Sequence, residues 1–90
     1  MLEKNIEKKL VEEIKNLKGL IYKFNSQSNS GVPDRLIILP NSKVYFVELK
    51  RPSGILSDLQ KYQIKRLKSM KQNVCVISSI EDLNNFLRSL

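Results

Sequence analysis

Apolar residues recur with a helical period at the start of the chain. From about Glu3 to Lys18 one side of the predicted helix carries Ile6, Leu10, Val11, Ile14 and Leu17. Gly19 stands where such a helix would end. Two further helices are expected, one over residues 58–71 with Ser57 as its N-cap, and one over residues 80–89 capped by Ser78 or Ser79.

Shorter apolar runs rich in β-branched and aromatic residues lie between these helices. They predict strands over residues 20–25, 34–39, 43–50 and 73–78. The second and third strands form a hairpin, with a tight turn centred on Asn41 and Ser42. The order α-β-β-β-α-β-α predicts an α/β fold, a mixed β-sheet flanked by helices. No repeat or linker interrupts residues 1–90, so a single domain is expected.

Composition narrows the class of protein. A hydrophobic content of 41% with 28% charged residues is typical of a globular domain. The longest purely apolar run, residues 36–39, is far too short to cross a membrane. The absence of histidine excludes Ser-His and Cys-His catalysis and histidine-bearing zinc sites. The one cysteine, Cys75, lies in an apolar run and no secretory signal is visible, so a reducing, cytoplasmic location is expected.

The net charge of +7 is unevenly spread. One block without any acid contains Lys61, Lys65, Arg66, Lys68 and Lys71. Such an excess attracts polyanions, and nucleic acid is the commonest of these in cells. A solvated lysine-rich helix surface explains the same block equally well. Charge therefore suggests DNA binding through the helix face of Lys61, Lys65 and Lys68 without establishing it.

Two carboxylates and a lysine are expected to meet at the end of the predicted hairpin. The turn places Asp34 opposite the segment from Glu48 to Lys50, and strand alternation puts Glu48 and Lys50 on one face. Val44 and Phe46 share that face, so a core-facing apolar stripe ends in two charges. Buried charges are costly unless they are paired or bind a metal. The simpler alternative is a salt bridge at a strand end, with Asp34 in an ordinary turn.

This set of residues fits the hydrolysis of a phosphodiester. Two carboxylates helped by a backbone carbonyl can hold Mg²⁺, which prefers oxygen ligands and keeps several waters. The metal lowers the pKa of a bound water and polarises the phosphoryl oxygen. The ammonium of Lys50 can orient the water and stabilise charge that develops on the phosphate. Mg²⁺ or Mn²⁺ is therefore the expected cofactor.

Two polar residues fall within the apolar arcs of the predicted helices. Glu7 could point into the same site as a further metal or water ligand, or it could merely compensate the helix dipole. Gln60 could also reach the site. However, Ser57-x-x-Gln60 equally fits a capping box, a purely structural role.

These residues together resemble the VRR-NUC family, the virus-type replication-repair nuclease domain of the PD-(D/E)XK superfamily. The matching elements, in order, are Glu7 in the first helix, Gly31-Val32-Pro33-Asp34, Glu48-Leu49-Lys50 and Gln60. The flanking residues Ser30, Arg35 and Arg51-Pro52 match as well. The resemblance covers nearly the whole chain and implies a restriction-endonuclease-like PD-(D/E)XK core.

The resemblance also implies a role for each matched residue. Asp34 and Glu48 would bind the metal together with the backbone carbonyl of Leu49, and Lys50 would position or activate the water. Glu7 would support the site as a further possible ligand. Gln60 would orient water or phosphate.

The resemblance further implies DNA as the partner, with Ser30, Arg35 and Arg51 beside the motif as candidate contacts. Small stand-alone members are similar to Holliday junction resolvases in being dimers, since a two-fold dimer provides two active sites for paired cuts. A homodimer acting on branched DNA is therefore expected.

The leading hypothesis is a metal-dependent, structure-selective DNA endonuclease. The alternative is a non-catalytic DNA-binding module that keeps the nuclease fold, supported by the basic helix face. The intact set of Asp34, Glu48 and Lys50 argues against that alternative. A third possibility is a structural domain in which these charged residues form only surface pairs.

Overall fold

The computed structural model describes residues 3–90. Its elements are α1 (Glu3–Asn16), β1 (Leu20–Lys23), β2 (Arg35–Ile38), β3 (Val44–Leu49), α2 (Asp58–Ser69), β4 (Asn73–Ile77) and α3 (Ile80–Arg88). This order confirms the predicted α-β-β-β-α-β-α arrangement, with each boundary within about two residues of the expected one. No helix in this described part of the chain is long and apolar enough to cross a membrane.

The four strands form one sheet in the order β1-β2-β3-β4. β1, β2 and β3 are antiparallel neighbours, whereas β4 runs parallel to β3. A parallel neighbour requires a crossover connection, and here α2 lies within that connection. The sheet is therefore mixed, as predicted.

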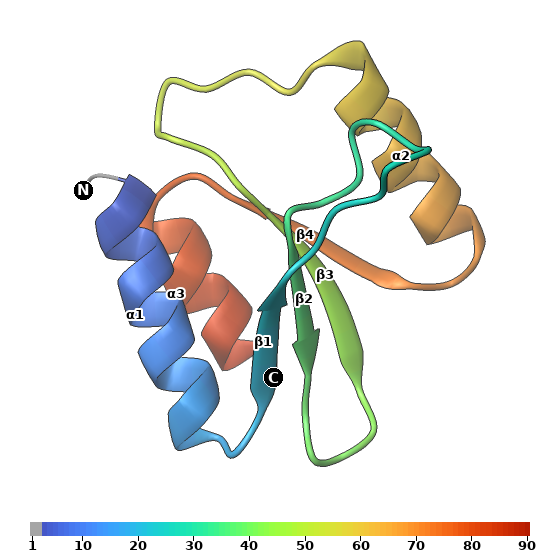
Figure 1. Cartoon of the computed structure of the whole chain (residues 1–90). Coiled ribbons are helices and arrows are strands. Elements are labelled where there is room, and N and C mark those ends of the chain that lie inside the picture. The colour runs from blue at the N-terminus through green and yellow to red at the C-terminus, as the bar shows by residue number, and fades with distance from the viewer. Residues whose placement is uncertain (1–2) are drawn as a thin grey trace.

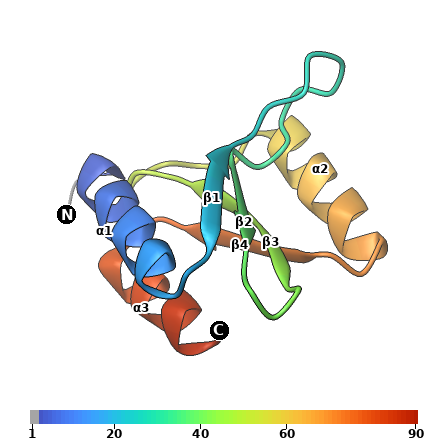
Figure 2. The same ribbon diagram turned by 60° about the horizontal axis from the view of Figure 1, so that its bottom comes forward.

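The main hydrophobic core lies between one face of the sheet and two helices. Figures 1 and 2 show α1 and α3 side by side on that face, with α2 on the other side of the molecule. The buried side chains of this core include Ile6, Leu10, Ile14, Ile37, Val47, Leu49, Ile77, Leu83 and Phe86. Each fully buried Ile or Leu contributes roughly 2 kcal/mol relative to an exposed one. Leu17, expected on the apolar side of α1, is exposed because the helix ends before it.

Lys18, rather than Gly19, takes the left-handed conformation at the end of α1. Its φ is 64°, and the N–H of Gly19 donates to the carbonyl of Ile14 while that of Lys18 donates to Lys15. These two bonds form a Schellman motif. Gly19 is needed for a close approach instead, because a Cβ there would lie 2.9 Å from Leu39 Cδ2 and 3.0 Å from Ile38 O.

The hairpin turn lies one residue earlier than expected. The N–H of Ser42 donates to the carbonyl of Leu39, so Pro40 and Asn41 are the central residues. Ser42 follows with a φ of 70°, as in a three-residue hairpin loop. The resulting register pairs Arg35 with Val47. The next pair along the two chains is Asp34 and Glu48, within the predicted range.

The second face of the sheet is largely uncovered. α2 packs mainly against β4 and leaves β1, β2 and β3 open on this side. Val44 and Phe46, predicted to face the core, lie half-buried on this open face, because α1 and α3 cover the opposite one. The stripe that leads to Glu48 and Lys50 is thus a secondary apolar surface.

Candidate active site

The predicted acidic residues meet at one end of the sheet. β2 begins there and β3 ends there, opposite the 39–43 turn, and α1 and α2 also begin at this end (Figure 1). Asp34 immediately precedes β2, Glu48 lies in β3, and Lys50 follows the last residue of β3. The main chain at Lys50 is held by a 2.9 Å hydrogen bond from its N–H to the carbonyl of Ile77 in β4.

Asp34 is fixed by hydrogen bonds from three other residues. Its Oδ1 accepts from the N–H of Leu49 at 2.9 Å, and its Oδ2 lies 3.1 Å from Nη1 of Arg35. Its carbonyl accepts from the N–H of Phe24 and from Nη1 of Arg35, each at 2.9 Å. Asp34 therefore joins β3 to the end of β1, and its carboxylate is held in one orientation.

The loop before Asp34 lies against the first turn of α2. Gly31 has a φ of +89°, and a Cβ at this position would lie 2.7 Å from the carbonyl carbon and oxygen of Leu59. Pro33 is fully buried behind it. Glycine is required here both for its left-handed conformation and for the close approach of two backbones. This packing brings α2 to the same end of the sheet as Asp34.

Glu48 is a buried carboxylate, 5% exposed. Its burial, followed by the nearby charge of Asp34, raises the pKa of Glu48 from its usual 4.5 to about 7. The ammonium of Lys50 acts in the opposite direction but does not offset these effects. Neither ion pair at the site includes Glu48. A buried acid beside another acid gains most from a cation that binds both.

The donor set fits a hard divalent cation. Because the N–H and C=O groups of a strand residue point the same way, the carbonyl of Leu49 is directed to the side where Asp34 receives its N–H. Two carboxylates and one carbonyl suit Mg²⁺, which keeps several waters. Within residues 3–90, no three Asp, Glu, His or Cys side chains form a group that could hold a metal. A metal held by Asp34 and Glu48 would therefore need the carbonyl of Leu49 and waters as its further ligands.

Glu7 forms an ion pair with Arg35 and does not join Asp34 and Glu48. Its Oε1 lies 2.8 Å from Nη2 of Arg35. Glu3, one turn earlier in α1, is the acid whose charge further raises the pKa of Glu48. Glu3 was not among the residues predicted to act at this site. The sequence could have indicated that Glu3 lies near the site, because Glu3 and Glu7 are four residues apart and so lie on one side of a helix.

The expectation that Arg35 contacts DNA does not agree with its position. Its side chain is 11% exposed, and its guanidinium lies between Glu7 and Asp34. The other proposed contacts are accessible: Ser30 and Arg51 are exposed in the two loops that flank the site. Arg51 begins a turn closed by the N–H of Gly54, 2.8 Å from the Arg51 carbonyl.

Gln60 forms the capping box that was one of its two predicted roles. Its Oε1 accepts from the N–H of Ser57 at 2.8 Å, and its own N–H donates to Oγ of Ser57 at 3.1 Å. The side-chain amide nitrogen is left for other contacts. The exposed residues Lys61, Lys65 and Lys68 continue along α2 away from this turn.

Comparisons with known proteins show the family to which the chain belongs. The family model described as "VRR-NUC domain" matches residues 2–80. The chain belongs to the VRR-NUC family. A phage relative, "Putative nuclease p44" of Acyrthosiphon pisum secondary endosymbiont phage 1, is 42% identical over 85 residues, which cover 94% of this chain and 90% of the relative. Membership of this nuclease family and this relative identify the chain as a nuclease domain.

A solved structure described as "VRR_NUC domain" has the same fold. It superimposes with a TM-score of 0.88 at 29% sequence identity, covering 96% of this chain and 94% of the other. The mixed sheet with its flanking helices is therefore the VRR-NUC fold.

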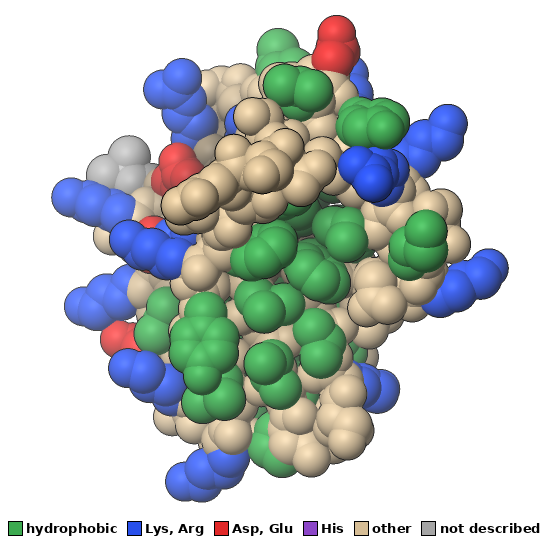
Figure 3. All heavy atoms as spheres, turned by 45° about the vertical axis from the view of Figure 1, so that its right-hand side comes forward, with side chains coloured by type: hydrophobic (Ala, Val, Ile, Leu, Met, Phe, Trp, Pro, Cys, Tyr) green, Lys and Arg blue, Asp and Glu red, His purple; other side chains and the backbone are tan. Residues whose placement is uncertain are grey.

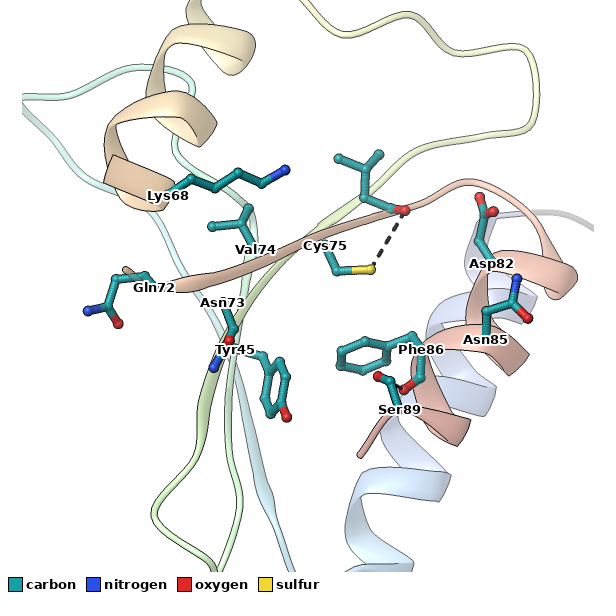
Figure 4. Close-up of a pocket in the computed structure, with 11 residues that line it drawn as sticks. Tyr45, Lys68, Gln72, Asn73, Val74, Cys75, Asp82, Asn85, Phe86 and Ser89 are labelled. Carbon is teal, nitrogen blue, oxygen red and sulfur yellow. Dashed lines mark hydrogen bonds between the residues drawn. The ribbon is translucent and has the colours of Figure 1, made fainter. Parts of the chain in front are cut away.

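A cavity lies away from the candidate site formed by Asp34, Glu48 and Lys50. It has a volume of about 550 Å³ and opens along β4, between the end of α2 and α3 (Figure 4). Tyr45 and Phe86 meet edge to face beside it, with ring centroids 5.4 Å apart. Asp34, Glu48 and Lys50 do not line this cavity. Because none of these three residues lines the cavity, we assign it no part in the nuclease chemistry.

Proposed function

We propose that this VRR-NUC nuclease is a metal-dependent DNA endonuclease that hydrolyses phosphodiester bonds in branched DNA such as Holliday junctions. The observation that carries the proposal is the meeting of Asp34, Glu48 and Lys50 at one end of the sheet, with Glu48 buried beside a second acid. Its place of action would be the cytoplasm of a bacterial or phage-infected cell.

Mg²⁺ or Mn²⁺, when bound, would supply a polarised phosphoryl oxygen and a water of lowered pKa. Asp34 and Glu48 would hold the ion with the carbonyl of Leu49. Glu48 must be deprotonated to do so, and its burial makes the cation the natural counter-charge. Lys50 follows Glu48 on the same face, so its ammonium can orient the attacking water and stabilise charge on the phosphate.

The DNA backbone would lie over the loops at this end of the sheet and along α2. Ser30 and Arg51 are exposed on the two loops, and Lys61, Lys65 and Lys68 are exposed on α2. Contacts of this kind bind phosphates and carry no sequence information. They support an enzyme that recognises the shape of its DNA.

The enzyme would act as a homodimer through the open face of the sheet. Figure 3 shows hydrophobic side chains gathered in the middle of this side of the molecule, with Lys and Arg around the rim. The strand register aligns them in two rows on this face, Leu20 with Ile38 and Val44, and Tyr22 with Leu36 and Phe46. Leu20 and Tyr22 are 50% and 51% exposed.

A second copy of the chain suits this open face better than DNA does. The two rows contain no charged residue in a chain of net charge +7, so they offer nothing to a phosphate. Six side chains in two rows are too few to form a stable interface by themselves, since such an interface buries about 800 Å² on each partner. α2 also exposes Leu59, Tyr62 and Met70, which can add to the apolar area that a dimer would bury.

Light scattering on Val44→Lys and Tyr22→Lys would test the dimer. We expect both variants to be monomeric, because two like charges would face each other across the two-fold axis. Leu17→Lys is the matched control: Leu17 is 46% exposed, but it lies at the end of α1, on the other side of the sheet. A wild type that is monomeric at the concentrations used for cleavage would overturn the dimer.

Cleavage assays would test the function itself. The protein would be incubated with four-way junction, flap, splayed-arm and linear duplex DNA, each with Mg²⁺, with Mn²⁺ and with chelator. We expect metal-dependent cleavage, strongest on the junction, that Lys50→Ala abolishes while DNA binding is retained. Lys43→Ala is the control, since Lys43 is exposed at the opposite end of the sheet.

Each outcome of these assays has a separate meaning. Symmetric paired nicks in the junction would support a resolving dimer. A preference for flaps would keep the endonuclease and replace its substrate. Binding without cleavage of any substrate would favour the non-catalytic DNA-binding module.

A further inference from the structure

A continuous set of polar contacts connects α1 to the metal-binding carboxylate. Oε1 of Glu7 lies 2.8 Å from Nη2 of Arg35. Nη1 of Arg35 donates to the carbonyl of Asp34 at 2.9 Å and lies 3.1 Å from its Oδ2. Oδ1 of the same carboxylate accepts from the N–H of Leu49 at 2.9 Å. Helix α1, strand β2 and strand β3 are thus joined through one guanidinium and one carboxylate.

We propose that Arg35 is a positioning residue of the nuclease site, which holds the Asp34 carboxylate in its metal-binding orientation and is itself held by Glu7. The inference rests on the proposed function, because Asp34 must first bind a metal for its orientation to matter. It assigns new roles to Arg35, which contacts Asp34 directly, and to Glu7, which acts on Asp34 through Arg35.

The chemistry of these contacts requires arginine. The guanidinium is planar, and its two terminal nitrogens diverge, so Nη2 can serve Glu7 while Nη1 serves Asp34. The single ammonium of a lysine cannot reproduce this geometry. A cation that is 11% exposed also needs partners, and the two carboxylates supply them.

The contacts leave Asp34 able to bind an ion. Each carboxylate oxygen can accept more than one interaction, and Arg35 and Leu49 each use one. The side chain of Asp34 is still 36% exposed. Residues that orient metal ligands in this way change metal affinity or activity by about 10- to 100-fold when they are replaced.

Mn²⁺ titration followed by electron paramagnetic resonance would test the inference. It would be carried out without DNA, in the Lys50→Ala protein, so that cleavage plays no part in the readout. We expect Arg35→Lys to weaken Mn²⁺ binding by about 10- to 100-fold and to leave metal-free DNA binding unchanged. Arg88→Lys, an exposed position on α3, is the matched control.

Glu7→Ala provides a second variant in case Arg35→Lys does not fold. It removes the anchor of Arg35 at a helix position whose side chain is 35% exposed, where alanine is a good helix former. We expect a weakening of Mn²⁺ binding in the same direction, and none in Glu12→Ala, a control on the same helix. Unchanged Mn²⁺ affinity in Glu7→Ala and Arg35→Lys would overturn the inference.

Other outcomes are equally decisive. Weaker DNA binding with unchanged Mn²⁺ affinity in Arg35→Lys would make Arg35 a DNA contact and overturn the positioning role. A wild type that neither binds Mn²⁺ nor cleaves DNA would show that the proposed function has failed, and the inference falls with it. A wild type that does both, beside an unaffected Arg35→Lys, would leave the function standing and remove the inference alone.

Discussion

The N–H of Leu49 donates a 2.9 Å hydrogen bond to Oδ1 of Asp34, just beyond the last main-chain pair of β2 and β3. A side chain thus replaces the next main-chain acceptor of the ladder. The strand that carries Glu48 is thereby tied directly to the second acid. The two carboxylates are positioned by the backbone of the hairpin, which is more rigid than contacts between long side chains.

The buried acid Glu48 should make the metal-free protein less stable at high pH. Its pKa of about 7 lies above the usual 4.5, so the folded chain binds this proton more tightly than the unfolded chain does. The stability that this group contributes is fully present below pH 4.5 and is lost as the pH rises through about 7. Glu48→Gln should therefore stabilise the chelator-treated protein at pH 8, by as much as about 3 kcal/mol.

Urea unfolding of the wild type and Glu48→Gln at pH 4.5 and pH 8 would measure this. The two proteins should differ at pH 8 and converge at pH 4.5, and Glu12→Gln, at an exposed position, should follow the wild type at both. A Glu48→Gln protein that gains nothing at pH 8 would contradict the prediction. Because Mn²⁺ competes with this proton, its affinity for the wild type should rise with pH up to about 7 and then level off.

Gln60 should act through the helix cap. Its Oε1 is already bonded to the N–H of Ser57, and a glutamate at this position of a capping box accepts the same bond. We expect Gln60→Ala to lower the free energy of unfolding by about 1 kcal/mol, and Gln60→Glu to retain both stability and cleavage. Thermal unfolding and junction cleavage would be compared for the two variants. A stable Gln60→Glu without cleavage would instead place the side-chain amide in the site.

Gly31 should not tolerate a side chain. Gly31→Ala combines a φ of +89° with a Cβ 2.7 Å from the carbonyl of Leu59, so either the loop or α2 must move. We expect the free energy of unfolding to fall by at least about 2 kcal/mol, and cleavage to fall because Asp34 follows in the same loop. Ser28→Ala, exposed in this loop, is the control for denaturant unfolding. Equal stability of the two variants would refute this packing.

The lysines of α2 should determine the salt dependence of DNA binding. Replacement of Lys61, Lys65 and Lys68 by alanine removes up to three phosphate contacts, and each contact contributes about 0.9 to the slope of log affinity against log salt. Fluorescence anisotropy in chelator at several salt concentrations would give this slope. The same replacement of Lys4, Lys8 and Lys15, exposed on α1, should leave it nearly unchanged. Equal losses in both triple variants would indicate only a general effect of net charge.

Local patterns in the sequence predicted the elements and the proximity of Asp34, Glu48 and Lys50. Helical and strand periodicities are properties of neighbouring residues, and the α-β-β-β-α-β-α order followed from them. Asp34, Glu48 and Lys50 could be placed together because one short turn fixes the register of a hairpin. The turn itself lay one residue earlier than expected, since Ser42 takes the left-handed conformation that completes a longer loop.

Contacts between distant elements were decided by the tertiary structure. A helical projection shows that Glu7 lies on the inner side of α1, but not that Arg35 of β2 lies opposite it at 2.8 Å. Strand alternation separates two faces of the sheet without stating which face α1 and α3 cover, so Val44 and Phe46 were assigned to the wrong one. The sequence by itself determined which side chains share an element and a face. Only the packing of those elements decided which charges lie together, and that packing raises the pKa of Glu48 and places the guanidinium of Arg35 between Glu7 and Asp34.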